Sequence, residues 1–105
     1  MKANELLKRI ESKSAPVIID ARTGIEFKHG HVPGAINAPS GKILLNTADL
    51  PADKDLEIVV YCEHGQRAWL ANKLLGFRGY RNTSLLEGSL MDWKKAGLPL
   101  EQQGS

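Results

Sequence analysis

Two hydrophobic patterns alternate along the chain. Short continuous apolar runs occur at residues 16–20 (PVIID) and 56–62 (LEIVVYC), and such runs are typical of strands buried on both faces. Elsewhere, apolar residues recur at intervals of three and four, which predicts helices. The helical segments are residues 3–12, 23–30, 66–77 and 89–97, with a looser one at 41–50. Residues 32–39 predict a turn leading into a short strand, and residues 82–88 a short strand or turn.

Residue types inside and at the ends of these helices add detail. Asn4 and Thr23 stand where N-caps are expected, because their side chains can accept hydrogen bonds from free backbone N–H groups. Gly30 marks the expected end of the second helix. In the longest helix a stripe is expected to face the core, and this stripe consists of Leu70, Leu74 and Phe77. Trp69 and Trp93 are also expected in the core, as aromatic residues on amphipathic helices.

Strands that alternate with helices predict an α/β protein with a parallel sheet covered on both faces. In such open sheets, ligands bind beyond the carboxyl ends of the strands. Cys62 is the last residue of the most apolar strand, and Asp20 ends the first. The pattern therefore places both residues at the edge of the sheet where a site is expected.

Length and composition fit one globular domain. The chain has 105 residues, 42% hydrophobic and 25% charged, with a formal net charge of +2 at pH 7. We place a single domain at residues 1–105, with an ordered core at about 4–98 and a tail at 100–105. Basic and acidic residues are interspersed, and no basic stripe carries aromatics, so nucleic acid is not expected as a partner.

The single cysteine cannot form an internal disulfide, which favours a reducing compartment. Residues 1–13 are charged throughout and lack the apolar segment of a signal peptide. No apolar run approaches the roughly 20 residues that span a bilayer. We therefore expect a cytoplasmic protein with no membrane partner, and we expect it to be a monomer or a weak dimer.

The stretch CEHGQR, residues 62–67, sets the cysteine between a buried strand and the first turn of a helix. Backbone N–H groups at a helix start lack internal partners and, with the helix dipole, form an anion site. Gly65 permits a positive φ angle, which helps these groups to turn inward. Arg67 adds a permanent positive charge. The loop therefore predicts a cradle for an anion, most simply the thiolate of Cys62.

The size of the expected rate gain indicates that the loop binds a larger anion than the Cys62 thiolate alone. A free cysteine, with a pKa near 8.5, is about 3% thiolate at pH 7, and a pKa lower by about two units would make roughly three quarters of it thiolate. Because nucleophilicity falls with pKa, with a Brønsted slope of about 0.4–0.5, the net gain in attack is only about threefold. The donors are better explained by an anion that grows after attack, or by an anionic substrate.

Several short motifs occur in order along the chain. They are DAR at 20–22, GHVPGAIN at 30–37, VVYCEHGQR at 59–67, GF at 76–77, and EG at 87–88 followed by Trp93. Each is weak alone, but together they resemble the rhodanese (sulfurtransferase) family over residues from about 4 to 98. The resemblance implies a rhodanese-like single domain with a doubly wound, mostly parallel sheet of four to five strands. Its usual first edge strand is reduced to residues 1–3.

By this resemblance Cys62 is the nucleophile, which takes sulfur from thiosulfate or a persulfide donor and becomes a persulfide. The cradle for donor and persulfide consists of Glu63, His64, Gly65, Gln66 and Arg67, with the last closing it. Asp20 and Arg22 support the site, and Arg22 is expected to pair with Glu26 or to order the loop. Cyanide, a small thiol or a protein accepts the sulfur, since no second cysteine can resolve the persulfide. No metal or organic cofactor is implied.

Two other functions stay open. Four residues separate Cys62 from Arg67, whereas related phosphatases carry one more and form a wider cradle. A phosphatase or arsenate reductase is therefore the less favoured alternative. Glu63 puts a negative charge beside the nucleophile, which should weaken binding of a dianion such as thiosulfate. This keeps open a non-catalytic sulfur carrier or interaction module that receives persulfide from a partner.

The histidines and a lysine pair have structural explanations. His64 is expected to be a solvated loop residue whose backbone N–H matters more than its ring. His29 and His31 lack metal-ligand spacing with the cysteine or a carboxylate, so no metal site is predicted. His31 is expected to be a turn residue bonded to backbone. Lys94 and Lys95 are expected on a solvated helix face.

Overall fold

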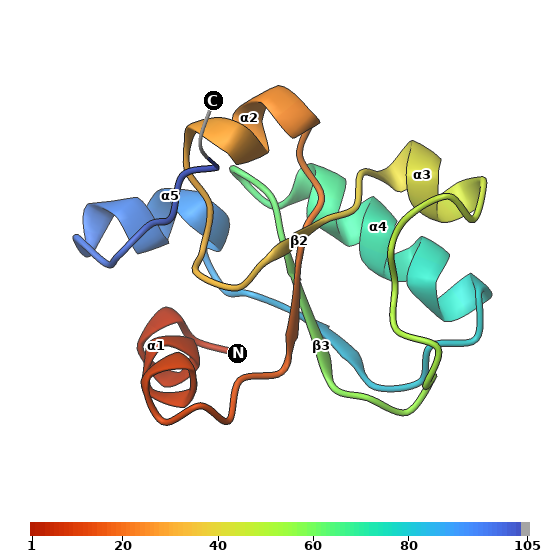
Figure 1. Cartoon of the computed structure of the whole chain (residues 1–105), viewed down its shortest axis with the longest axis horizontal. Coiled ribbons are helices and arrows are strands. Elements are labelled where there is room, and N and C mark those ends of the chain that lie inside the picture. The colour runs from red at the N-terminus through yellow and green to blue at the C-terminus, as the bar shows by residue number, and fades with distance from the viewer. Residues whose placement is uncertain (104–105) are drawn as a thin grey trace.

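Strands and helices alternate along the chain in the computed structural model, which describes residues 1–103 (Figure 1). In chain order the elements are α1 (Ala3–Glu11), β1 (Val17–Asp20), α2 (Gly24–His29), β2 (Ile36–Asn37), α3 (Ser40–Leu44), β3 (Ile58–Tyr61), α4 (Gln66–Phe77), β4 (Thr83–Leu85) and α5 (Ser89–Lys95). The strands form one parallel sheet in the order β2-β1-β3-β4. This is the predicted α/β class, with a strand number inside the predicted range. No helix within residues 1–103 has both the length and the apolar character needed to cross a membrane.

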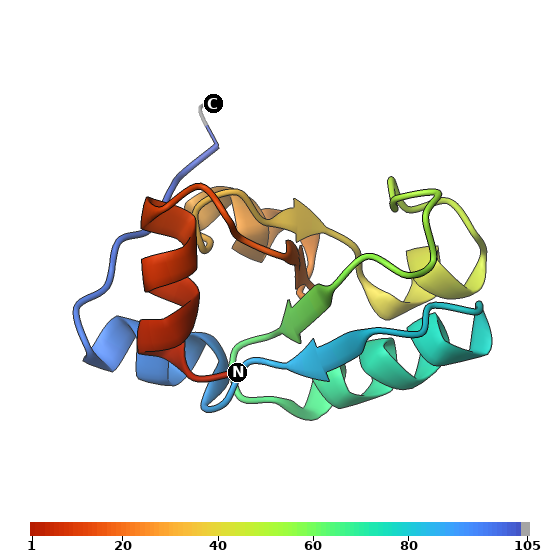
Figure 2. The same cartoon turned by 90° about the horizontal axis from the view of Figure 1, so that it is seen from below.

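Helices cover both faces of the sheet, as the alternation of elements predicted. Successive side chains of a strand point to opposite faces. Ile58 and Val60 of β3 pack in the cluster with α3 and α4, while Val59 and Tyr61 pack in the cluster with α1 and α5. Figures 1 and 2 show these two helix pairs on opposite sides of the strands. The central strand β3 is buried along its whole length, which agrees with its continuous apolar sequence.

Helix ends follow the predicted signals at α2 but not at α1. Thr23 Oγ1 accepts the N–H of Glu26, and the Glu26 carboxylate accepts the N–H of Thr23, which forms a capping box. The C-cap of α2 is Gly30, as predicted. The predicted cap at Asn4 is wrong, because this residue lies inside α1 and no side chain caps that helix. Helix α3 covers only the first part of the segment predicted at 41–50.

Helix α4 has the predicted bounds but turns a different face to the core. Its buried residues are Ala68, Ala71 and Leu75. In the predicted stripe, Leu70 and Phe77 are 47% and 83% exposed, whereas Leu74 is partly buried against the core as predicted. The two buried alanines let this face of the helix pack closely against the sheet. Trp69 is also 56% exposed, so its assignment to the core is wrong, whereas Trp93 is fully buried as predicted.

The segment at residues 101–103 pairs with the turn after α2, although it was predicted to be part of a tail. His31 and Glu101 exchange two backbone hydrogen bonds of 2.9 and 2.8 Å. The Gly34 N–H also donates to the Glu101 carboxylate at 2.7 Å. The first part of the predicted tail is thus held by the fold, and residues 104 and 105 lie outside the described residues.

The first residue also pairs with the sheet edge. The amino group of Met1 donates to the Leu85 carbonyl at 3.0 Å, and the Met1 carbonyl accepts the Glu87 N–H at 2.9 Å. Of the edge-strand remnant predicted at residues 1–3, only Met1 makes these sheet-edge contacts, because α1 already begins at Ala3.

Candidate active site

The loop CEHGQR begins at the carboxyl end of β3, next to the carboxyl end of β1. Asp20, the last residue of β1, is in register with Tyr61, the last residue of β3. Cys62 and Asp20 therefore meet at one edge of the sheet, as predicted, and this is the edge where ligands bind in open parallel sheets. In Figure 1 the loop after β3 lies close to α2.

Cys62 is buried, yet its sulfur accepts a backbone hydrogen bond. Only 1% of the residue is exposed, and it packs in the apolar cluster on the α4 side of the sheet. The Gly65 N–H lies 2.9 Å from the Cys62 sulfur. Gly65 has a φ angle of 119°, in the left-handed region that glycine adopts without steric cost. The inward turn of the loop that the glycine predicted is therefore present at this position.

Further amides of the loop are available to a larger guest. Within residues 1–103, no acceptor is hydrogen-bonded to the N–H groups of Glu63, His64, Gln66 or Arg67. The last two amides belong to the first turn of α4, where no partner exists inside the helix. The positive end of the α4 dipole points toward the same place. An anion that extends beyond the cysteine sulfur can therefore be met by several donors.

The start of α5 holds the loop from the other side. Ser89 Oγ accepts the Cys62 N–H at 3.3 Å. The N–H groups of Leu90 and Met91 donate to the carbonyls of Cys62 and Glu63 at 2.9 and 3.0 Å. Sequence reasoning missed Ser89, because no local pattern shows that its hydroxyl will meet a residue 27 positions earlier. Its φ of 50° is uncommon for a residue other than glycine.

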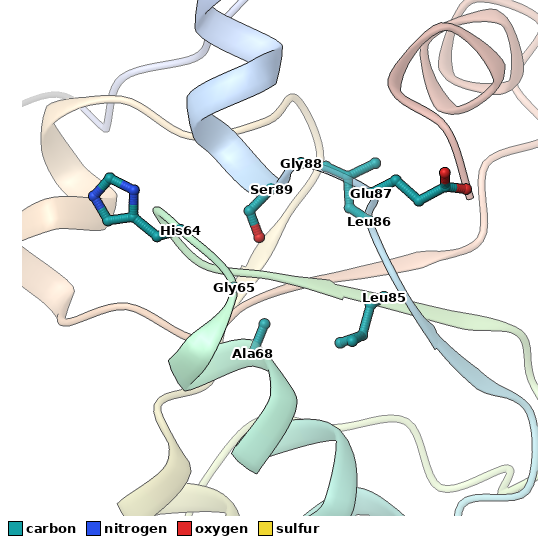
Figure 3. Close-up of a pocket in the computed structure, with 8 residues that line it drawn as sticks. All are labelled: His64, Gly65, Ala68, Leu85, Leu86, Glu87, Gly88 and Ser89. Carbon is teal, nitrogen blue, oxygen red and sulfur yellow. The ribbon is translucent and has the colours of Figure 1, made fainter.

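A cavity of about 250 Å³ lies beside the loop, between the start of α4 and the turn from β4 to α5. Figure 3 shows its lining, which consists of His64, Gly65, Ala68, Leu85, Leu86, Glu87, Gly88 and Ser89. In that view the His64 ring and the Glu87 carboxylate point away from each other, to opposite sides. His64 is exposed, as predicted for a solvated loop residue.

Arg67 is bound by Glu26. Its two terminal nitrogens donate to the two carboxylate oxygens at 2.6 and 3.0 Å, a forked geometry typical of strong pairs. The bond to Arg67 holds the pKa of Glu26 down, at about 2. The pKa of Arg67 is raised, chiefly by Glu26 and to a lesser extent by negative charge on Cys62. The predicted pairing of Arg22 with Glu26 is therefore wrong, because that carboxylate belongs to Arg67.

Arg22 instead pairs with Asp20 and also bonds to the turn after α2. Its contact with Glu63 of the Cys62 loop fits the other predicted alternative, that it orders the loop. Two guanidinium nitrogens lie 2.8–3.1 Å from the Asp20 oxygens, and one of them donates to the Gly30 carbonyl at 2.6 Å. The Tyr61 hydroxyl donates to Asp20 at 2.8 Å. Burial raises the pKa of Tyr61, and the charge of Asp20 raises it further. Asp20 thus has the role of a hydrogen-bonded strand end.

Glu63 is paired with two cations. Its carboxylate lies 3.5 Å from Arg22 Nη1 and 3.3 Å from Lys94 Nζ. The negative charge predicted beside the nucleophile is therefore present, but two cations offset it. Lys94 is partly solvent-exposed, as predicted, but it also binds the loop, which the sequence pattern did not show. His31 donates or accepts through Nδ1 at 2.7 Å from the Phe27 carbonyl, which agrees with a backbone-bonded turn residue.

The predicted site residues thus gather at one sheet edge, and Arg22 has a different partner from the predicted Glu26. The loop residues 62–67 and the strand-end pair Asp20–Arg22 are connected through Glu63. The side chain of Gln66 is exposed, and within residues 1–103 it has no hydrogen-bond partner. Two further residues that touch the loop, Glu26 and Ser89, were not predicted to do so. The capping-box pattern identified Glu26 as a helix-start residue, but not as the partner of a distant arginine.

Residues 2–96 match the rhodanese-like domain family, and the chain belongs to this family. It is 30% identical over 98 residues to a sulfurtransferase from Allochromatium vinosum, a match that covers 93% of this chain and 90% of that protein. It is 34% identical over 106 residues to the thiosulfate:glutathione sulfurtransferase of Saccharomyces cerevisiae, with 89% and 76% covered. The resemblance found in the sequence is thereby confirmed.

Solved structures agree with this assignment. The rhodanese-related protein from Thermoplasma volcanium superposes with a TM-score of 0.81 at 26% identity, which covers 98% of this chain and 97% of that one. Two further sequence relatives, each 32% identical, are longer proteins, and the chain spans 53% and 42% of their lengths.

Proposed function

We propose that this chain is a sulfurtransferase that carries sulfane sulfur as a persulfide on Cys62. The observation that carries the proposal is the Gly65 N–H directed at the cysteine sulfur, within a loop where four further amides, those of residues 63, 64, 66 and 67, have no acceptor among residues 1–103. A persulfide places a second sulfur about 2 Å beyond the first. These four amides are the donors that can stabilise its charge there.

The transfer has two steps. The Cys62 thiolate attacks the outer sulfur of thiosulfate, a new S–S bond forms, and the electron pair of the broken bond leaves with sulfite: Cys–S⁻ + S₂O₃²⁻ → Cys–S–S⁻ + SO₃²⁻. A thiolate acceptor then attacks the terminal sulfur and leaves as R–S–S⁻, which returns the Cys62 thiolate. A small thiol is the proposed acceptor, and a cytoplasmic location, favoured by the single cysteine, would supply it.

Intact mass spectrometry after incubation with thiosulfate tests this proposal. The expected result is a mass gain of one sulfur atom, absent in Cys62→Ser and reversed by cyanide. Ser84 lies on β4, outside the cradle, so Ser84→Ala is a suitable control that should load like the unmodified chain. A chain that gains no sulfur from thiosulfate or from an organic persulfide would contradict the proposal.

A second candidate is a sulfur carrier that is loaded by a partner and turns over thiosulfate poorly. The observations that favour it are the burial of Cys62 and the engagement of Arg67 by Glu26, because both limit attraction of a free dianion. Stoichiometric loading from a persulfide donor, together with negligible steady-state turnover of thiosulfate, would select the carrier. Hydrolysis of an aryl phosphate would instead support the phosphatase alternative.

A further inference from the structure

The charged side chains around the cradle are already paired with one another. Arg67 binds Glu26, Arg22 binds Asp20, and Lys94 binds Glu63, which also faces Arg22. Three cations therefore stand against three carboxylates. The Glu87 carboxylate, which lines the adjacent cavity, lies 3.7 Å from the amino group of Met1. The donors left for a guest are the uncharged amides of the loop.

Glu26 is the carboxylate that neutralises the cation of the loop itself. Its Oε1 atom accepts hydrogen bonds from the Thr23 N–H, the Thr23 hydroxyl and Arg67 Nη1, so α2 holds it in place. The pair lies at the surface, with 43% of the Arg67 side chain and 35% of the Glu26 side chain exposed. A donor that approaches Arg67 therefore meets a fixed negative charge at the same point.

We infer that Glu26 sets the charge preference of the cradle, so that a singly charged organic persulfide is a better sulfur donor than dianionic thiosulfate. This inference rests on the proposed function, since it concerns the donor for Cys62. The repulsion between Glu26 and a donor scales with the charge of the donor. Glu26 is thus a specificity-determining residue, which acts through Arg67 and through its own charge.

The persulfide reaction needs no additional reactant. The Cys62 thiolate attacks the terminal sulfur of the persulfide anion R–S–S⁻, the new S–S bond forms, and the old S–S bond breaks. Its electron pair leaves with the thiolate: Cys–S⁻ + R–S–S⁻ → Cys–S–S⁻ + R–S⁻. This step brings together two negative charges, whereas attack on thiosulfate brings together three. Amide donors without a free cation suit the first case better.

Glu26→Gln is the sharpest variant, because glutamine can form the same capping box while removing the charge. Glu57→Gln is the matched control: Glu57 also binds an arginine, Arg9, at 2.7 Å, but at the opposite end of β3. Loading of Cys62 is followed by intact mass spectrometry with thiosulfate and with 2-hydroxyethyl persulfide, whose only charge is on sulfur. Thermal melting of each variant verifies folding.

In the unmodified chain, persulfide is expected to load faster than thiosulfate. Glu26→Gln is expected to speed thiosulfate loading about tenfold and persulfide loading about threefold, because the logarithm of the change doubles with the donor's charge. Added salt should shrink both changes. Equal changes with the two donors, slower loading with both, or an equal effect of Glu57→Gln would overturn the inference while leaving the proposed function standing.

A second readout does not depend on sulfur transfer. Sulfate and nitrate, with two charges and one, should slow alkylation of Cys62 by neutral iodoacetamide, and Glu26→Gln should strengthen sulfate protection more than nitrate protection. If neither donor loads Cys62, the proposed function fails, and this comparison still decides the charge preference. Equal strengthening by both anions would overturn it.

Discussion

Asp20 and Glu26 are both carboxylates beside the Cys62 loop, yet their surroundings differ. Asp20 is fully buried, and Arg22 and Tyr61 supply its hydrogen bonds. A buried charge of this kind can be kept only with its partners, because removal of one partner leaves the other uncompensated. Glu26 is partly solvated, so it can lose its charge without leaving a buried cation. Asp20 is therefore required for the structure of the site, whereas Glu26 can be substituted to change the charge of the site.

Glu26 should contribute to stability in a pH-dependent way. Its pKa is about 2 in the folded chain and 4.5 ordinarily. A depressed pKa stabilises the fold above the unfolded value, and this stabilisation is lost as pH falls from about 4.5 toward 2. Glu26→Gln should therefore unfold at lower urea concentration than the unmodified chain at pH 7, with the gap closing below about pH 4. A gap that stays constant over this range would contradict the assignment.

The chemistry of single residues was predictable where it is local. Cys62, Gly65 and Arg67 lie in one short loop, so their type and spacing predict an anion cradle. The partner of Arg67 was not predictable, because Arg67 and Glu26 are 41 residues apart in the chain. Several carboxylates compete for each cation, and only the packing of α2 against the loop decides between them.

At the scale of elements, the bounds of α4 were predictable from the sequence but its buried face was not. Its length and ends are visible in the sequence, since residues 66–77 are good helix formers that follow a glycine. Its buried face is not, because two alanines and one leucine face the core while larger apolar side chains point outward. Hydrophobic spacing favours the face with the most large apolar residues, but the buried face combines Leu75 with two alanines.

Substitutions on the two faces of α4 should therefore differ in cost. Leu75→Ala removes a fully buried side chain and should lower the free energy of unfolding by about 2–5 kcal/mol. Phe77→Ser alters an exposed side chain and should change it by less than about 0.5 kcal/mol. Urea titration measures both values. A similar loss for the two variants would show that Phe77 is covered in solution.

At the scale of the whole molecule, the order of elements was enough to predict a parallel sheet with helices on both faces. That prediction succeeded because crossover connections between parallel strands leave few topologies. The fate of the last residues was not predictable in the same way. Residues 101–103 are polar, and their pairing with the turn after α2 depends on where that turn lies in space.

The pairing of Glu101 with His31 should contribute measurably to stability. Glu101→Pro removes the N–H that donates to the His31 carbonyl. We expect a loss of about 1 kcal/mol in unfolding free energy and faster hydrogen exchange at the His31 amide. Gln103→Ala, which keeps the backbone donor of that residue, is the control. Unchanged exchange at His31 would show that the segment is loose in solution.

The hydrogen bonds between the Cys62 loop and the start of α5 determine which residues are needed to transfer the site to another protein. The backbone of Cys62 and Glu63 is hydrogen-bonded to residues 89–91, which come from a later part of the chain. If residues 58–77 alone were grafted onto another protein, the carbonyls of Cys62 and Glu63 would lose these hydrogen bonds and the loop would not keep its conformation. A graft must therefore include the turn before α5 as a second, separate segment.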